Sequence, residues 1–183
     1  SLGVLDSGLT VEIESLEQIF PGVQNFTRDD ELDVVKNRVE LFIKENQLEN
    51  NVTLILNERG LLIRMLDATL FDSGKAEIRE ESKYIIDGIA DVIKKAENYV
   101  RIEGHTDNVP INTFRYPSNW ELSTARAVNV LKYLIENHGV EPKRLSAVGY
   151  GEYHPIDTNE TPEGRQNNRR VDIMIIRTNK NGS

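Results

Sequence analysis

The sequence predicts a layered α/β or α+β domain, in which helices pack on one sheet. Two observations lead to this fold class. Short segments with β-type composition alternate with longer segments whose apolar residues recur at helical spacing. The order along the chain is helix, hairpin, helix, strand, helix, strand, loop and strand, and such alternation favours helices layered on a single sheet.

The first predicted element is a helix over Asp29–Gln47. For residues 1–27, which mix glycine, serine and acids with scattered apolar residues, we expect a mobile or partner-dependent segment. The apolar stripe of the helix favours packing on the domain that follows, and a dimer contact through a short coiled-coil-like seam is the alternative. The stripe consists of Leu32, Val35, Val39 and Phe42, widened by Leu41 and Ile43.

Two β-rich runs within Val52–Leu66 predict a hairpin, because they flank a turn that ends in Gly60, a residue able to take positive φ. A loop is predicted over Ala68–Ala76, which carries several turn residues. A second helix is predicted over about Arg79–Ala96. Its inward stripe consists of Ile85, Ile89, Val92, Ile93 and Ala96.

The next predicted strand covers Tyr99–Gly104, and a third helix follows a polar loop. Ser118 and Glu121 match a capping box, in which a serine at the cap and an acid three residues later satisfy the first N–H groups of a helix. The helix is predicted to run to about Asn137, and Gly139 then provides a C-terminal stop signal.

The last two strands are predicted over Leu145–Gly149 and Arg170–Arg177. A long polar loop joins them, running through Pro155 and Pro162 to Asn168. The Gly-Tyr-Gly run at its start does not form a phosphate loop, because it precedes no predicted helix and lacks the lysine of that motif.

Composition narrows the possible functions. The chain has 183 residues, a net charge of −8 and no cysteine, so disulfides, thiolate nucleophiles and cysteine metal sites are excluded. Residues 1–50 hold 11 acidic and 4 basic residues and therefore carry most of the charge. An acidic chain without a basic stripe binds nucleic acid and anionic membrane surfaces poorly. No apolar run approaches the roughly 18–20 residues of a membrane span, and the first residue is not methionine, so we expect any membrane anchor to lie upstream.

A carboxylate at a strand end and a cation on the following helix form the candidate binding site. Asp107 follows the strand that ends at Gly104, where it can accept hydrogen bonds from a ligand ammonium group. Arg126 can hold a ligand carboxylate with two parallel hydrogen bonds. Thr106 and Asn119 can add neutral hydrogen bonds. The alternative is that Asp107 and Arg126 pair with each other.

Catalysis and metal binding have weaker support. The three histidines match no metal-ligand spacing. Ser118 or Ser123 could serve a hydrolase, but the chain lacks the GxSxG sequence of a nucleophile elbow. A glycosidase pair would require Asp107 to meet a carboxylate from another segment, such as Asp72. We therefore expect a protein without catalysis, cofactor or metal.

Four blocks of sequence carry a family resemblance. GHTDNVP, NWELSTARAVNVLKYL, RLSAVGYGEYHP and EGRQNNRRVDIMI occur in order between about Thr69 and Ile176, and together they resemble the OmpA-like peptidoglycan-binding domain. Within that family, NVPI and YPSNWELSTARA most resemble the flagellar motor stator subunits of MotB type. The acidic segment before the domain also suits the periplasmic linker of such a subunit. The resemblance implies a β-α-β-α-β core with a mixed sheet and with helices on one face.

The resemblance also implies non-covalent binding of the peptidoglycan stem peptide, typically through its diaminopimelate residue. Asp107 then matches the acid that meets the amino group of the ligand, and Arg126 matches the arginine that meets the carboxylate. The segment Asn108–Ser118 is longer than in many outer-membrane members and contains Pro110 and Pro117, so it can reshape or cover the site. Further contacts fall, by resemblance, at Asn119, at one of Arg169 and Arg170, and at the loop residues Phe71 and Asp72.

The resemblance predicts three parts of the chain: an acidic periplasmic linker with a helix over residues 1–50, a peptidoglycan-binding domain over residues 51–178, and a tail over residues 179–183. The expected function is a non-catalytic anchor that attaches a flagellar motor stator to the cell wall. Expected partners are peptidoglycan, a MotA-like subunit and a second copy of the chain, without nucleic acid. The expected location is the periplasmic portion of a single-pass inner-membrane protein. An outer-membrane or lipoprotein anchor without a motor role is the alternative, and a cell-wall hydrolase is less favoured.

Overall fold

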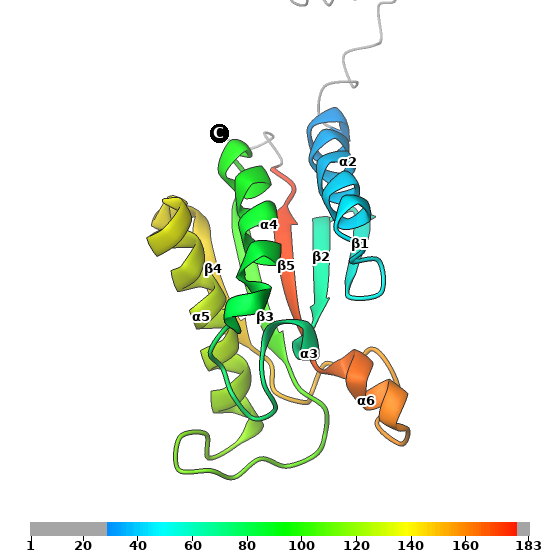
Figure 1. The fold of residues 1–183 in the computed structure, drawn as a ribbon, viewed down its shortest axis with the longest axis vertical. Helices are drawn as coiled ribbons and strands as arrows, with labels where there is room; N and C mark the ends of the chain where they lie inside the picture. The colour runs from blue at the N-terminus through cyan, green and yellow to red at the C-terminus, as the bar shows by residue number, and fades with distance from the viewer. Residues whose placement is uncertain (1–28, 179–183) are drawn as a thin grey trace, which may run out of the picture. The chain divides into compact units, whose positions relative to one another are not determined.

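The computed structural model describes residues 29–178 (Figure 1). The expected mobile segment at residues 1–27 and the tail at residues 179–183 lie outside this range. The chain divides into two compact units, Ser1–Val34 and Val35–Ser183. Of the first unit, the described part is the beginning of helix α2 (Asp29–Glu45), and the second unit contains every other element.

The second unit is built on one five-stranded mixed sheet with the order β1-β2-β5-β3-β4. Strands β3 and β4 run parallel, and the other neighbouring strands are antiparallel. The predicted mixed sheet is therefore confirmed. The strands are β1 (Val52–Asn57), β2 (Gly60–Leu66), β3 (Val100–His105), β4 (Leu145–Gly149) and β5 (Arg170–Ile176).

Two long helices, α4 and α5, cover one face of this sheet (Figure 1), which confirms the predicted two-layer arrangement. Helix α5 begins after Ser118, whose Oγ accepts a hydrogen bond from the Trp120 N–H, and it ends at Gly139 with φ of 64°. Both ends were predicted from these residues. The helical elements are α3 (Asp67–Leu70), η1 (Glu80–Ser82), α4 (Lys83–Lys95), α5 (Asn119–His138), η2 (Pro142–Arg144) and α6 (Pro162–Asn168).

Helix α5 approaches β3 and β4 closely because both strands carry glycine where the helix crosses them. A Cβ atom on Gly104 would lie 2.0 Å from the Ser123 carbonyl oxygen, and one on Gly149 would lie 2.1 Å from Thr124 Oγ1. Gly104 therefore faces α5, and by the two-residue alternation of strands so does Ile102. The same face supplies the apolar core, whose fully buried members include Leu61, Ile63, Ile102, Ile173 and Ile175.

Helix α2 contributes to the second unit from Val35 onward. Val39 and Ile43 are buried, and the Phe42 ring lies against Gly88 of α4, where a Cβ would be 2.3 Å from it. Leu41 is 57% exposed, so its place in the buried stripe was predicted wrongly. This packing supports the first interpretation of the helix, whereas the dimer contact stays a prediction.

Three local predictions need correction. The predicted loop after the hairpin begins as the short helix α3, and helix α4 starts at Lys83 after the 3-10 turn η1, rather than at Arg79. The long polar loop before β5 contains helix α6, which has no apolar stripe and was missed. Its signals were local: Thr161 caps it by accepting from the Gly164 N–H, and Pro162 opens its first turn. Every helix within residues 29–178 is too short or too polar to cross a bilayer.

Candidate functional site

A cavity of about 660 Å³ opens at one end of the sheet. Strand β5 runs antiparallel to β2 and β3, so its first residues lie beside the last residues of both, and Arg170 pairs with Leu66 on one side and with His105 on the other. The polar residues that flank these strand ends therefore meet. The lining includes Asp67, Phe71, Asp72, Ser73, Arg79, Thr106, Asp107, Val109, Pro110, Ile111, Asn119, Leu122, Arg126, Arg165 and Arg169.

Arg126 is the most buried charged residue of this pocket, with 2% of its surface exposed. Its Nη1 donates to Asp67 Oδ2 over 2.9 Å and its Nε donates to the Lys75 carbonyl over 2.8 Å. Nη2 reaches the Asp72 carbonyl at 3.4 Å, and the guanidinium lies 4.9 Å from the centre of the Phe71 ring. Burial lowers the pKa of Arg126, and the Asp67 carboxylate opposes that shift. The guanidinium is thus held in one orientation.

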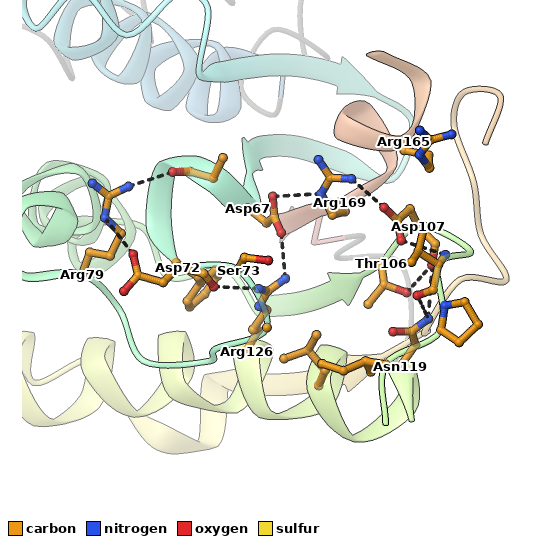
Figure 2. A pocket seen from close by; sticks show the side chains of 17 residues that line it. Asp67, Asp72, Ser73, Arg79, Thr106, Asp107, Asn119, Arg126, Arg165 and Arg169 are labelled. Carbon is orange, nitrogen blue, oxygen red and sulfur yellow. Dashed lines mark hydrogen bonds and ion pairs between the residues drawn. The ribbon is translucent and has the colours of Figure 1, made fainter. Parts of the chain in front are cut away.

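Asp67, the first residue of α3, links two arginines (Figure 2). Besides its bond to Arg126, its Oδ1 lies 3.6 Å from Arg169 Nε. Its backbone N–H donates to the Arg169 carbonyl over 2.9 Å, which continues the β2–β5 ladder by one residue. Asp67 was not among the predicted site residues. The sequence offered no motif for it, since it is a single acid after an apolar strand, inside a segment interpreted as hairpin and loop.

Asp107 is 6% exposed and pairs with Arg169 rather than with Arg126. Its Oδ2 lies 2.5 Å from Arg169 Nη1, and its Oδ1 accepts from the Val109 N–H over 3.0 Å. The Arg169 side chain is 34% exposed, so this pair borders solvent. Asp107 and Arg126 therefore do not pair with each other, and that alternative is wrong.

The backbone around Asp107 is held by two neighbouring polar residues. Asn119 donates from Nδ2 to the carbonyls of Asp107 and Val109, over 3.3 and 3.1 Å. Thr106 donates from its hydroxyl to the Asp107 carbonyl over 2.8 Å, and its N–H donates to the Gly151 carbonyl. Both residues line the pocket, and they also orient the strand end that carries the carboxylate.

The long segment between β3 and α5 forms one wall of the pocket. Val109, Pro110 and Ile111 line the cavity, and Ile111 packs on a small apolar cluster that contains Tyr116 and Leu122. The segment therefore shapes the site, which is one of the two outcomes expected from its length.

The rim adds further charge. Arg79 donates to the Ala68 carbonyl and lies 3.8 Å from Asp72, while Arg165 donates to the Asn159 carbonyl. In Figure 2, Arg79 and Asp72 lie at one end of the pocket, and Asp107 and Asn119 lie at the other. The lining thus holds four guanidinium groups and three carboxylates, a mixture that suits a ligand bearing both an ammonium and a carboxylate group.

Seven of the eight predicted site residues line this one pocket: Phe71, Asp72, Thr106, Asp107, Asn119, Arg126 and Arg169. Arg170 is the exception. It is 3% exposed, donates to Asp172 Oδ2 over 3.2 Å, and lines a second cavity of about 380 Å³ on the opposite face of the sheet. Successive residues of a strand point to opposite faces, and Arg170 is the first residue of β5, so it turns away from the pocket that Arg169 lines.

The residues considered for other chemistry have structural roles. Ser118 caps α5, and the buried Ser123 accepts from the Gly151 N–H and donates to the Trp120 carbonyl. Glu103, His105 and Asp172 could together offer metal ligands within 4.8 Å of one another. However, Asp172 already accepts hydrogen bonds from two arginines, and we assign no metal there.

Known proteins resemble this chain in sequence and in fold. Motility protein B of Bacillus subtilis (strain 168) is 46% identical over 149 residues, which is 80% of this chain and 57% of the relative. The chain thus spans less than two thirds of that relative. The structure of the cell wall anchor of the T6SS from Pseudomonas aeruginosa matches with a TM-score of 0.71 at 35% identity, covering 77% of this chain and 98% of that one. The periplasmic domain of Helicobacter pylori MotB (residues 78–256) matches with a TM-score of 0.66 at 30% identity, covering 72% and 85%.

The part of the chain that matches a family model includes most of the residues that line the pocket. The model of the OmpA family matches residues 70–169, more than half of the chain, and this range contains Asp107, Arg126 and Arg169. Asp67 lies three residues before its start. The chain belongs to the OmpA family.

Proposed function

We propose that this chain is the peptidoglycan-binding part of a flagellar motor stator subunit, which anchors the stator to the cell wall without catalysis. The observation that carries the proposal is the pocket at the end of the sheet, where Asp107 and Arg126 line one cavity without pairing with each other. The 46% identity to a motility protein B and the fold likeness to a cell wall anchor support the same function.

The pocket suits the zwitterionic end of a stem peptide, such as its diaminopimelate residue. Arg126 is held by Asp67 and by two backbone carbonyls through three of its five N–H groups. Its remaining N–H groups can therefore meet a ligand carboxylate with little loss of side-chain entropy. At the other side of the pocket, a ligand ammonium group would donate to Asp107 in place of Arg169, which is the more exposed member of the present pair.

The affinity of one such site is modest. Hydrogen bonds to charged groups contribute about 1.5–3 kcal/mol each, and part of this gain is offset because Asp107 must exchange one cation for another. Two linked sites gain by effective concentration. We therefore propose that the complete subunit works as a homodimer, with a MotA-like partner, and that this chain is its periplasmic portion. A single membrane span in the complete subunit belongs to the same proposal.

An anchor of the outer membrane or a lipoprotein, without a motor role, is the alternative. It is less favoured because the match to the motility protein extends over 149 residues, whereas the model of the OmpA family covers residues 70–169. Likeness outside the binding domain is expected for a stator subunit and is not required for an unrelated anchor.

Co-sedimentation with purified cell-wall sacculi tests the binding site. The wild-type chain should sediment with sacculi, and Asp107→Asn, which keeps the shape of the side chain but removes its charge, should remain in solution. Asp91→Asn on the exposed side of α4 is the matched control and should sediment as the wild type does. Equal sedimentation of all three proteins would refute the site.

Motility tests the biological role. A strain that lacks the full-length gene should build normal filaments but fail to swim, and the Asp107→Asn gene should not restore swimming. Normal swimming of the deletion strain would favour the anchor without a motor role. The pure protein should also release no soluble muropeptides from sacculi, and measurable release would indicate a hydrolase instead.

A further inference from the structure

A stacked aromatic pair lies next to the charged pocket. The rings of Trp120 and Tyr153 have centroids 5.1 Å apart and planes inclined by 23°. Trp120 is 48% exposed and Tyr153 is 61% exposed. Two large aromatic rings that stack on each other and still face solvent form an apolar surface larger than a single exposed side chain, and such surfaces often mark a contact with a ligand.

Two backbone connections place this pair next to residues that line the pocket. Trp120 directly follows Asn119 in the first turn of α5. Gly151 lies beneath the indole, where a Cβ would be 3.5 Å from Trp120 Cδ2, and its carbonyl accepts from the Thr106 N–H over 2.9 Å. Thr106 and Asn119 lie at the end of the pocket opposite Arg79 (Figure 2). From these two connections, we place the aromatic pair beside that end.

The same contacts hold the pair in place before any ligand arrives. Ser123 Oγ accepts from the Gly151 N–H over 3.0 Å and donates to the Trp120 carbonyl over 3.1 Å, so one buried hydroxyl joins both segments. Gly151 has φ of 59°, in the left-handed region that favours glycine. A preorganised surface loses little entropy when it binds, which distinguishes this pair from aromatic residues on a free loop.

We propose that Trp120 and Tyr153 bind the face of a sugar ring in the glycan strand whose stem peptide occupies the charged pocket. This inference rests on the proposed function. A pyranose ring presents several C–H groups on one face, and these carry partial positive charge toward the electron-rich face of an aromatic ring. The pair carries no formal charge, so it complements the neutral glycan, whereas the pocket beside it complements the charged peptide.

A comparison of two ligands tests the inference: a free stem peptide, and the same peptide still joined to its disaccharide. Trp120 is the only tryptophan of the chain, so its fluorescence reports directly on the proposed contact. The disaccharide-peptide should shift the tryptophan emission and bind roughly tenfold more tightly, which corresponds to about 1.4 kcal/mol. The free peptide should bind without a comparable shift.

Variants then separate the glycan contact from the peptide contact by calorimetric titration. Trp120→Leu and, independently, Tyr153→Ala should each remove most of the roughly tenfold advantage of the disaccharide-peptide and leave the affinity for the free peptide unchanged. Tyr99→Ala is the matched control, because Tyr99 is 58% exposed and precedes β3 at the strand end away from the pocket. Circular dichroism confirms that each variant is folded.

Three results would overturn the inference. The first is an equal loss of affinity for both ligands in both variants, which would make the pair a support of the pocket. The second is that both variants keep the wild-type affinity for the disaccharide-peptide and that this ligand does not change the tryptophan emission of the wild type. The third is a loss of self-association by the variants with no effect on either ligand, since the pair would then be a contact between copies of the chain. Failure of the proposed function has a different signature, in which the wild type binds neither the disaccharide-peptide nor the free peptide.

Discussion

Arg169 and Arg170 are neighbours in the chain, yet they belong to two different charge clusters. Arg169 reaches into the pocket beside Asp107 and Asp67, and one third of its side chain is exposed. Arg170 is buried on the opposite face of the sheet, where it donates to Asp172 and to the carbonyls of Asn168 and His154. Arginine paired with aspartate occurs on both faces, so this pairing alone does not explain the difference.

The difference lies in which parts of the chain bring the charges of each cluster together. On the face opposite the helices, Arg64 donates two parallel hydrogen bonds of 2.9 Å to Asp172. The two residues are also directly paired in the β2–β5 register, so regular sheet geometry brings them together. In the pocket, the charged residues come from strand ends, from α5, from α6 and from the segment between α3 and η1, and they surround a cavity. Charges that the strand register pairs directly stabilise the fold, whereas charges that separate segments bring to the rim of an open pocket can exchange partners with a ligand.

Arg126→Ala should have the largest effect, because Arg126 is as buried as Arg170 on the opposite face and yet lines the pocket. Both the free energy of unfolding and sacculus binding should therefore decrease. Its removal leaves the Asp67 carboxylate buried with only the 3.6 Å contact to Arg169. Breaking a buried ion pair typically costs about 3–5 kcal/mol, and we expect a decrease of that size in the free energy of unfolding, measured by urea denaturation. Sacculus binding should be lost as well. An unfolding free energy within about 1 kcal/mol of the wild type would show that Arg126 serves the ligand alone.

Arg170→Ala, in the cluster on the opposite face, should lower the stability of the fold and leave sacculus binding unchanged. The variant loses three hydrogen bonds, one of them to a carboxylate that keeps its bonds from Arg64. We expect the free energy of unfolding to fall by about 1.5–3 kcal/mol, the range for bonds to charged groups. At urea concentrations below its denaturation midpoint, where the variant is folded, it should still sediment with sacculi. Loss of binding by a folded Arg170→Ala protein would contradict the division into two clusters.

Arg169→Ala is the counterpart, with a smaller expected effect on stability. Arg169 is one third exposed, so breaking its ion pair with Asp107 should cost less than breaking the buried pair of Arg126 and Asp67, and the urea midpoint should fall less than in Arg126→Ala. Sacculus binding should weaken at least tenfold, since the Arg169 guanidinium that a ligand ammonium displaces from Asp107 is then available to hold a ligand carboxylate, and the variant lacks it. The two variants differ by one position along the chain, so each serves as the control for the other. Equal binding by both would refute the role of Arg169.

This pair also illustrates what the sequence could predict. The family motif located a basic contact at one of two adjacent arginines, but only the strand register decides which one faces the pocket, and the register depends on where β5 begins. Helix α5 was predictable because its stripe, its serine cap and its terminal glycine all agree. Helix α6 was not, because PEGRQNN has no apolar periodicity and only its cap marks it. Asp67 was missed because its role depends on contacts with Arg126 and Arg169, 59 and 102 positions away in the chain.

The smallest expected effect concerns His105, the residue that links the two clusters, since it lies in the opposite cluster and directly precedes Thr106 and Asp107. Its ring faces Glu103 at 3.6 Å and Asp172 at 3.9 Å, with Arg170 on the same face. It also stacks on Tyr150 and meets the edge of His154. Both ring nitrogens are buried without a hydrogen-bond partner among the described residues.

Burial lowers the pKa of His105 below its ordinary value near 6.5, and the nearby Glu103 carboxylate, which favours the charged ring, only partly opposes this. The unfolded chain therefore binds more protons than the folded protein as the pH falls through 6.5, so this histidine makes the protein less stable in mild acid. Between pH 7.5 and pH 5, the free energy of unfolding should fall less in His105→Gln than in the wild type. Urea denaturation at each pH measures this difference, and His154→Gln is the control on the same face. An unchanged or steeper pH dependence in His105→Gln would mean that the carboxylates of Glu103 and Asp172 stabilise the charged imidazolium more than burial disfavours it.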